Sequence, residues 1–466
     1  MTAAKKKNSL HTLVLIFIVV LGTAALTWVV PGGEYTREVK NNRTLVVPNS
    51  FKYVESNPQG LDDVLVAPII GFAKAAEIIV FVLLIGGTFY ILDKTGAMTT
   101  SIKYMAIRFS TKPHLQKFFI PVSMLVFSVA GSIFGMCEET MPFVLIFIPL
   151  AISLGYDSIV GTAIPFLGAA SGFAGSTLNP FTVGIAQSIA ELPLYSGLEY
   201  RIVIWIISAI CMITFVMLYA ARIKKDPKKS PVYEIDLQRK NRIEIHNHDE
   251  AVLTKRHKII MTMFGSGIIF LVYGILGLGW FINEIAAFFL AMGIATGYIG
   301  GMKSGEIADG FKEGAKDMMG VALIIACAKA LLVVANDGKI LDSMLYGLAG
   351  IIQELHPIMG AQAMFVVQGV INFFVHSGSG QAALTMPIMG PLADVTGISR
   401  QTAVLAFQFG EGWINPILPT SGVTMGVLGL AGIPWSKWAR WMVPAQIFFF
   451  ILALLLLIPP FYINYH

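Results

Sequence analysis

The tripeptide Thr140-Met141-Pro142 returns as Thr385-Met386-Pro387, 245 residues further along a chain of 466 residues. Four other short matches keep the same order, at separations between 236 and 245 residues: Gly71-Phe72 with Gly310-Phe311, Gly96 with Gly338, Pro149-Leu150-Ala151 with Pro391-Leu392-Ala393, and Asn179-Pro180 with Asn415-Pro416. One such match means nothing by itself. Five in the same order indicate an internal repeat, and this repeat decides the architecture.

The composition is that of a chain buried in lipid. Hydrophobic residues make up 55% of it and charged residues only 13%, about half of the roughly 25% found in soluble domains. This balance excludes a soluble enzyme, a disulfide scaffold and a disordered tail. The three cysteines, Cys137, Cys211 and Cys327, lie in apolar stretches and are interpreted as packing residues. The composition predicts a polytopic membrane protein.

The basic residues set the orientation. Residues 222–258 carry eleven Lys/Arg against six Asp/Glu, and residues 94–117 carry five basic residues and no acid. The positive-inside rule places both stretches in the cytoplasm. Lys5, Lys6 and Lys7 precede an apolar run at 10–30, which we interpret as an uncleaved first helix with a cytoplasmic N-terminus rather than as a signal peptide.

The apolar segments divide into two comparable halves, 1–221 and 259–466, joined by the basic loop 222–258. Uninterrupted spans are expected at 78–92, 201–221, 259–278, 285–299, 318–335 and 441–458. Segments too short to span comfortably predict re-entrant hairpins at 118–154 and 359–395. Two longer spans, 158–190 and 402–430, are interrupted around Asn179-Pro180 and Asn415-Pro416, where proline removes a donor and stops the helix.

Counting spans places Gly71 on the outer side of the membrane and Gly310 on the cytoplasmic side. Because these corresponding residues lie on opposite sides, the repeat is inverted. The predicted fold class is an all-α polytopic membrane protein with an inverted repeat, two re-entrant hairpins and two broken transmembrane helices. Inverted repeats with broken helices are typical of secondary transporters. Irregular backbone at membrane depth is tolerated where it lines a cavity, and its free N–H and C=O groups can hold an ion or a polar substrate.

The two hairpin tips and the two breaks resemble those of the ion-transporter superfamily. The residues that carry the likeness are 138–142, 377–387, 176–180 and 411–416. The chain is most similar to the C4-dicarboxylate anaerobic carrier-like (YfcC-type) family, some members of which are labelled basic amino acid antiporters, and more distantly to divalent-anion/sodium symporters. The resemblance implies a homodimer and elevator-type movement of a transport domain. The repeated Ser-Asn-Thr signature of the symporters is not reproduced.

Polar residues at the tips and breaks are the candidate substrate- or ion-binding residues. They are Glu138, Glu139, Thr140, Ser176, Thr177, Asn179, His376, Ser377, Ser379, Gln381, Glu411, Trp413, Asn415, Thr420 and Ser421. Lys329 is a possible charge partner, because it interrupts an apolar span. Acids at membrane depth are costly and usually face a cavity or a partner. Three acids without Lys or Arg beside them favour a cationic or zwitterionic substrate over a dianion.

These observations predict a secondary active transporter of small charged metabolites, with amino acids first and basic ones such as arginine or ornithine favoured. The alternative is a C4-dicarboxylate carrier. An ion channel and an intramembrane hydrolase are more remote, because the chain has neither a His-Glu-x-x-His motif nor the spacing of a nucleophile elbow. We expect no enzyme activity, no cofactor, no firm metal site and no nucleic-acid partner.

Coupling stays open between protons at the acids or His376, sodium at Asn179 and Asn415, and exchange of one substrate for another. The expected location is the cytoplasmic (inner) membrane, where the partners are the lipid bilayer, a small-molecule substrate and a second copy of the chain.

Overall fold

The computed structural model describes residues 12–40, 43–98, 100–101, 113–245, 253–278, 280, 282–463 and 465. Several sequence-based predictions fall outside these residues. They concern Lys5, Lys6 and Lys7, the start of the first helix at residue 10, the basic residues Lys103, Arg108 and Lys112, and part of the basic loop at 246–252.

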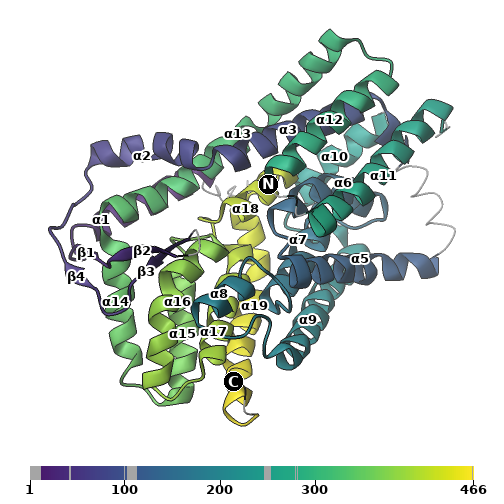
Figure 1. The fold of residues 1–466 in the computed structure, drawn as a ribbon. Coiled ribbons are helices and arrows are strands. Elements are labelled where there is room, and N and C mark those ends of the chain that lie inside the picture. The colour runs from purple at the N-terminus through teal and green to yellow at the C-terminus, as the bar shows by residue number, and fades with distance from the viewer. Residues whose placement is uncertain are drawn as a thin grey trace, which may run out of the picture.

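Helices make up most of the described chain (Figure 1). The first half and the loop contain α1 Thr12–Leu26, α2 Leu61–Lys74, α3 Ala76–Lys94, α5 Pro113–Phe134, α6 Met141–Ser153, α7 Ser158–Ala174, α8 Val183–Ile189, α9 Leu198–Lys225 and α10 Tyr233–Ile245. The second half contains α11 Lys255–Leu278, α12 Ile282–Ile299, α13 Ser304–Asp337, α14 Ile340–Ile352, α15 Pro357–Asn372, α16 Gly378–Val395, α17 Arg400–Gly412, α18 Gly422–Ala431 and α19 Trp435–Leu456.

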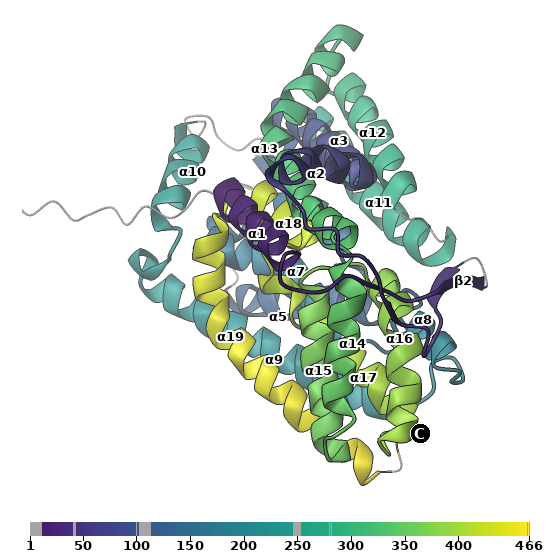
Figure 2. The ribbon, with the colours of Figure 1, turned by 90° about the vertical axis from the view of Figure 1, so that its left-hand side faces the viewer.

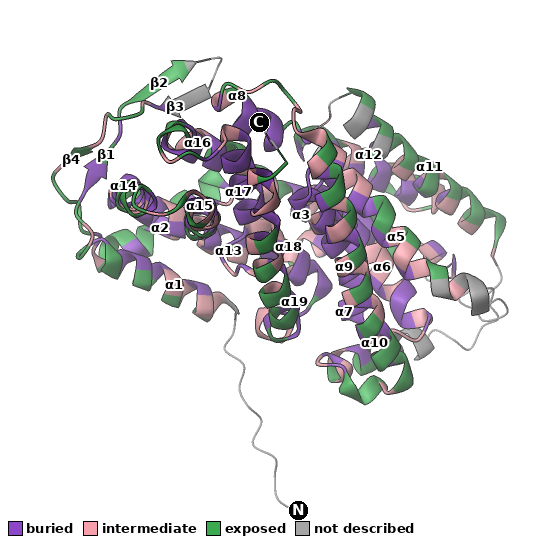
Figure 3. Ribbon diagram, turned by 90° about the horizontal axis from the view of Figure 1, so that it is seen from below, coloured by how far each residue is buried: buried purple, intermediate pink, exposed green. Residues whose placement is uncertain are grey.

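Six helical segments of the described chain are long and apolar enough to cross a membrane: Ala76–Lys94, Leu198–Lys225, Ile282–Ile299, Ser304–Asp337, Arg400–Ala431 and Trp435–Phe461. Large apolar side chains remain exposed on α9 and α19, as at Ile206, Ile210 and Ile451, and Figure 3 shows these exposed stretches on the outer faces of both helices. Exposed apolar faces of this kind are suited to lipid. The predicted all-α polytopic membrane fold is confirmed.

The helices pack in two groups, which Figure 2 shows as an upper and a lower assembly. In the first, named here the α13 group, α13 packs along α1, α2 and α3, α12 packs on α3, and α11 on α12. The second, the α7–α17 group, consists of α5–α9 and α15–α19, with α7 against α5, α6, α9 and α17, and α16 against α8 and α17. Helix α18 joins the two groups, because it packs against both α13 and α6.

In each half, a glycine allows two helices to pack closely against each other. A Cβ placed on Gly172 of α7 would lie 1.8 Å from the carbonyl oxygen of Ser128 in α5, so only glycine permits this approach. In the second half a Cβ on Gly410 of α17 would lie 2.5 Å from Cβ of Gln368 in α15. Gly172 and Gly410 are 238 residues apart, within the range of the sequence repeat. Small residues let membrane helices approach closely, and both halves use them at the same place.

The described residues between α1 and α3 form four short strands and α2. β1 Gly33–Glu34 pairs antiparallel with β4 Lys52–Tyr53, and β2 Arg37–Lys40 with β3 Arg43–Val46. The segment is anchored on α14, where Arg37 forms a 2.8 Å ion pair with Asp342 and Phe51 stacks on Tyr346.

Three helices extend or add to the predicted spans. The carboxylate of Asp63 accepts the Gly60 N–H at 2.8 Å and so caps α2. Glu306 accepts the Lys303 N–H at 2.7 Å in the same way, and α13 begins at Ser304 rather than at residue 318. Helix α14 was not among the predicted spans.

Candidate functional site

Four irregular segments separate helices at the places where the sequence predicted interruptions. We name them tip 1 (135–140, between α5 and α6), break 1 (175–182, between α7 and α8), tip 2 (373–377, between α15 and α16) and break 2 (413–421, between α17 and α18). The two halves thus share one order of elements: helix, tip, helix, helix, break and short helix. That the halves are inverted, and that the tips are re-entrant, stay predictions.

Tip 1 folds back on itself through a glycine and a short 3-10 turn. Gly135 has a φ of +69°, and Glu138–Thr140 form the turn. The Cys137 N–H donates to Oε2 of Glu139 at 2.9 Å, and the Thr140 hydroxyl donates to the Cys137 carbonyl oxygen at 2.6 Å. Glu139 therefore has a structural role within the tip, whereas the carboxylate of Glu138 lines a cavity described below.

Break 1 is held by the end of α5. Backbone N–H groups of Thr177 and Leu178 donate to the carbonyl oxygen of Ser132, at 3.0 and 3.2 Å. The hydroxyl groups of Ser132 and Thr177 hydrogen-bond to each other at 2.9 Å. Asn179 is fully buried, and its Oδ1 accepts the Phe181 N–H at 2.9 Å. A Cβ on Gly135 would lie 2.6 Å from Oδ1 of Asn179, so tip 1 directly covers break 1.

Tip 2 and the first residue of α16 contact the two breaks. His376 Nε2 and the hydroxyl of Thr420 in break 2 hydrogen-bond at 2.6 Å. Gly378, the first residue of α16, lies against Thr182 of break 1 and Glu411 of α17, because an added Cβ would be 2.5 Å from Cγ2 of Thr182 and 3.6 Å from Oε1 of Glu411. Ser377 caps α16 by accepting the Gly380 N–H.

Break 2 carries the most connected polar network of the four segments. Asn415 Nδ2 donates to Oε1 of Glu411 at 2.8 Å, and Asn372 Nδ2 donates to Oδ1 of Asn415 at 3.2 Å. The Thr424 hydroxyl donates to the Asn415 carbonyl oxygen at 2.6 Å, and Ser421 caps α18. Both polar atoms of the Asn415 side chain are thus engaged, and the carboxylate of Glu411 is held at a fixed orientation.

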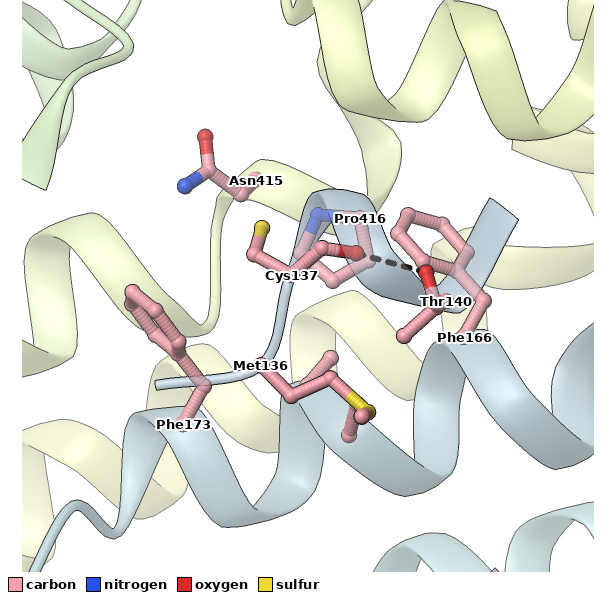
Figure 4. Close-up of a pocket in the computed structure, with 10 residues that line it drawn as sticks. Met136, Cys137, Thr140, Phe166, Phe173, Asn415 and Pro416 are labelled. Atoms are coloured by element: carbon pink, nitrogen blue, oxygen red, sulfur yellow. Dashed lines mark hydrogen bonds between the residues drawn. The ribbon is translucent and has the colours of Figure 1, made fainter. Parts of the chain in front are cut away.

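The two breaks adjoin across the α7–α17 contact. A Cβ on Gly412 would lie 2.6 Å from Cα of Ala174, the last residue of α7. A cavity of about 20 Å³ lies between tip 1, α7 and break 2. Figure 4 shows Met136, Cys137 and Thr140 of tip 1 beside Asn415 and Pro416 of break 2 among the residues that line it. Helix ends from the two halves therefore meet in the protein interior.

A second cavity, of about 60 Å³, lies between this region and α13. Four polar side chains line it, one from each of four elements: Glu138 of tip 1, Lys329 of α13, His376 of tip 2 and Thr420 of break 2. Lys329, predicted as a possible charge partner, therefore faces the same space as Glu138. Most of the other lining residues are apolar, among them Phe374 and Leu332.

Five of the buried polar atoms without a hydrogen-bond partner lie at or beside these segments. Among the described residues, Ser176 Oγ, Asn179 Nδ2, Thr182 Oγ1, Asn372 Oδ1 and Glu411 Oε2 have no hydrogen-bond partner. A buried polar group left unpaired costs on the order of 1–3 kcal/mol, and native structures contain few of them. Unpaired polar atoms around two helix breaks are what a site completed by a polar ligand would show.

Other predicted residues lie at the edge of this region or serve packing. Ser377 and Ser379 are exposed and hydrogen-bond to each other. Gln381 Nε2 donates to Gln368 of α15 and so ties the two arms of the second hairpin together. The Trp413 indole stacks on Phe409 and donates to Ser208 of α9, so its ring packs among helices.

Three side chains of the region were not predicted as site residues. Thr182 and Ser132 lack a sequence signal, since each is a small hydroxyl residue in an apolar stretch. Asn372 was interpreted as a helix-packing residue, but its carboxamide holds Asn415. The sequence feature that could have identified Asn372 as a site residue is its position as a polar side chain at the very end of a hairpin arm.

Sodium at the two asparagines stays a prediction, and the two side chains differ in the polar atoms they leave free. Both amide oxygens already accept a hydrogen bond, and the free atom, Asn179 Nδ2, is a donor. Hard cations take oxygen ligands, so this free amide is better matched to a substrate oxygen. No group of three or more His, Cys, Asp or Glu side chains that could hold a metal ion occurs among the described residues.

Together, the membrane-spanning helices and the interior site define a multi-pass membrane transport protein, and comparison with known proteins gives its family. Residues 10–462 match the C4-dicarboxylate anaerobic carrier family, and the chain belongs to this family. It is 36% identical to the protein of Escherichia coli (strain K12) named "Putative basic amino acid antiporter YfcC", with 92% of each chain covered. It is 29% identical to an uncharacterized protein of Haemophilus influenzae (strain ATCC 51907 / DSM 11121 / KW20 / Rd), covering 95% of this chain and 96% of that one.

Two solved structures are similar at a distance. The YdaH transporter of Alcanivorax borkumensis has a TM-score of 0.40 at 15% identity, over 96% of this chain and 97% of that one. MtrF of Neisseria gonorrhoeae has a TM-score of 0.41 at 18% identity, over 97% and 95%.

Proposed function

We propose that the protein is a secondary active transporter of amino acids, with basic ones such as arginine and ornithine preferred. The observation that carries the proposal is the carboxylate of Glu411. It is 2% exposed, Asn415 fixes one of its oxygens, and the other has no partner among the described residues. An uncompensated buried charge is costly, and a cationic ligand at this oxygen would compensate it.

The charges around the site support the same substrate class. Tip 1 contributes Glu138 and Glu139, whereas neither tip and neither break contains a lysine or arginine. Two like charges about 4 Å apart repel by about 4 kcal/mol at an effective dielectric constant of 20. A dianion would meet this repulsion, whereas an amino acid with a cationic side chain would be attracted. The name of the Escherichia coli relative points to the same class.

A C4-dicarboxylate is the second candidate, and the family description favours it. Helices α6, α16 and α18 all begin at a tip or break, and helix N-termini attract anions. The free donor Asn179 Nδ2 would also suit a carboxylate oxygen. In this case the acids of tip 1 would have to be protonated.

Coupling stays open between exchange, protons and sodium, because the free oxygens of Asn372 and Glu411 could accept a proton donor or a cation. The two helix groups support elevator-type alternating access, in which the α7–α17 group moves against the α13 group.

We further propose a homodimer in the cytoplasmic membrane. We place its N-terminus in the cytoplasm, because the described basic residues of 222–258 exceed the acids of that loop and mark it as cytoplasmic.

The test is uptake into proteoliposomes that contain the purified full chain. Labelled arginine, ornithine, succinate and fumarate are compared, each with a preloaded counter-substrate, a pH step or a sodium gradient. We expect saturable arginine uptake that preloaded ornithine accelerates. Saturable uptake of succinate but not of arginine would replace the first candidate with the second, and flux that never saturates would indicate a channel.

A further inference from the structure

The cavity of about 60 Å³ beside α13 is larger than a water molecule needs. It lies between the two helix groups, because Lys329 comes from α13 and the other polar side chains come from tip 1, tip 2 and break 2. Lys329 lies more than two turns before the end of α13, Ser304–Asp337, which is one of the segments long enough to cross a membrane. An ammonium group at such a depth normally has a partner.

The two opposite charges that line this cavity do not form an ion pair. Glu138 and Lys329 both reach it, yet neither forms an ion pair with any described residue. The surrounding lining includes Ile78, Ile325 and Leu332, which exclude water and strengthen electrostatic interactions. A carboxylate and an ammonium that face one apolar space without touching match a ligand that carries both charges itself.

A hydrogen-bonded pair, His376 and Thr420, lines the same cavity. His376 Nε2 and Thr420 Oγ1 are 2.6 Å apart and fix each other. Because the Thr420 hydroxyl has a second position for a hydrogen bond, it can bind a ligand oxygen while it keeps its contact with His376.

We infer that this cavity binds the α-ammonium and α-carboxylate groups of the substrate, with the ammonium at Glu138 and the carboxylate at Lys329 and Thr420. The inference rests on the proposed amino acid substrate. An α-amino acid carries both charges on one carbon atom and compensates both side chains at once, whereas a dicarboxylate or a diamine would compensate one and oppose the other. Glu411 then remains for the cationic side chain.

The test compares ligands that lack one of the two groups. Binding of arginine, agmatine (no carboxylate) and 5-guanidinopentanoate (no α-amine) to the purified full chain is measured by calorimetry. We expect the wild type to bind arginine at least about tenfold more tightly than either analogue, a difference of about 1.4 kcal/mol. Lys329→Gln should weaken arginine binding to the level of agmatine and leave agmatine unchanged, and Lys329→Arg should restore part of the preference.

The matched control is Lys316→Gln on the same helix, whose exposed ammonium pairs with Glu313; its arginine-to-agmatine ratio should equal that of the wild type. The ratio compares two ligands on the same protein sample, so it does not depend on how much of that sample is folded. If Lys329→Gln yields no folded protein, Glu138→Gln tests the other charge, and it should lose the preference for arginine over 5-guanidinopentanoate.

A wild type that binds arginine and agmatine equally, or a Lys329→Gln variant that keeps the wild-type ratio, overturns the inference while the proposed function stands. A wild type that binds succinate and no amino acid overturns both.

Discussion

Asn179 and Asn415 occupy matching positions of the two halves, 236 residues apart, but their side chains are bonded differently. Asn415 uses both of its polar atoms, since it accepts from Asn372 and donates to Glu411. Asn179 uses only Oδ1, and its Nδ2 has no partner among the described residues. Break 1 therefore leaves an amide donor for a ligand, whereas break 2 leaves two oxygen atoms, Glu411 Oε2 and Asn372 Oδ1.

The acids are distributed just as unequally. In the first half Glu138 and Glu139 lie at the tip and the break has no acid, whereas in the second half Glu411 lies beside the break and the tip has none. The same order of helices, tip and break (the repeated frame) thus carries different polar side chains in its two copies. The frame positions the helix ends, and the side chains that differ between the copies define what the site can bind.

The frame itself should tolerate least change. Gly172→Ala would place a Cβ 1.8 Å from a backbone oxygen of α5, where neither side can yield, and we expect no folded protein. Size-exclusion chromatography and thermal melting check this. Gly320→Ala is the matched control, because a Cβ there meets nothing within 4 Å. A Gly172→Ala variant that folds with the wild-type melting temperature would break the account of the α5–α7 contact.

Glu411→Gln should abolish transport. The change keeps the shape of the side chain and removes the charge, so we expect arginine uptake to fall by about a hundredfold or more, the equivalent of roughly 2.7 kcal/mol. Uptake into proteoliposomes is the measurement. Glu354→Gln, at an exposed acid after α14, should transport like the wild type. Arginine uptake by Glu411→Gln within about threefold of the wild type would contradict the role of this carboxylate.

Asn415→Ala should reduce stability, because it leaves Oε1 of Glu411 without its donor, although Asn372 keeps its contacts with the carbonyl oxygens of Gly410 and Glu411. A buried group left unpaired costs on the order of 1–3 kcal/mol, so we expect a loss of about 2 kcal/mol, seen as a lower melting temperature. An unchanged melting temperature would mean that break 2 does not depend on this network.

Asn179→Ala should have the smallest effect on stability and act on binding instead. It removes one hydrogen bond, to the Phe181 N–H, worth about 1 kcal/mol, and it removes the free donor. We expect arginine to bind about tenfold more weakly, as measured by calorimetry. The contrast between the two asparagines fails if Asn179→Ala lowers stability as much as Asn415→Ala and leaves affinity unchanged.

Much of the fold follows from local sequence signals. α7 ends at Ala174, and α17 at Gly412, next to glycines and Asn-Pro pairs that stop helices irrespective of their surroundings. The start of α13 could not be predicted from apolar residues, because its first turns are polar and the helix is set by the Glu306 cap.

The roles of the site residues were less predictable. Sequence alone treats Asn179 and Asn415 alike, since their difference depends on Asn372, which reaches Asn415 only in the folded chain. The same holds for Trp413, whose ring packs on Phe409 because α17 turns that face inward. Glu138 and Lys329 were each singled out as charges at membrane depth, but the cavity they share is a property of the fold.

The most direct test of the central claim, that the tips and breaks of both halves form one substrate site, uses Cys137. This residue lines the cavity between tip 1 and break 2, while Cys211 of α9 lies outside it and serves as an internal control. Alkylation of both thiols is followed by mass spectrometry while arginine is added. Arginine should slow the modification of Cys137 and leave that of Cys211 unchanged, with half-protection at the concentration that half-saturates transport. Equal rates for Cys137 with and without saturating arginine would contradict it.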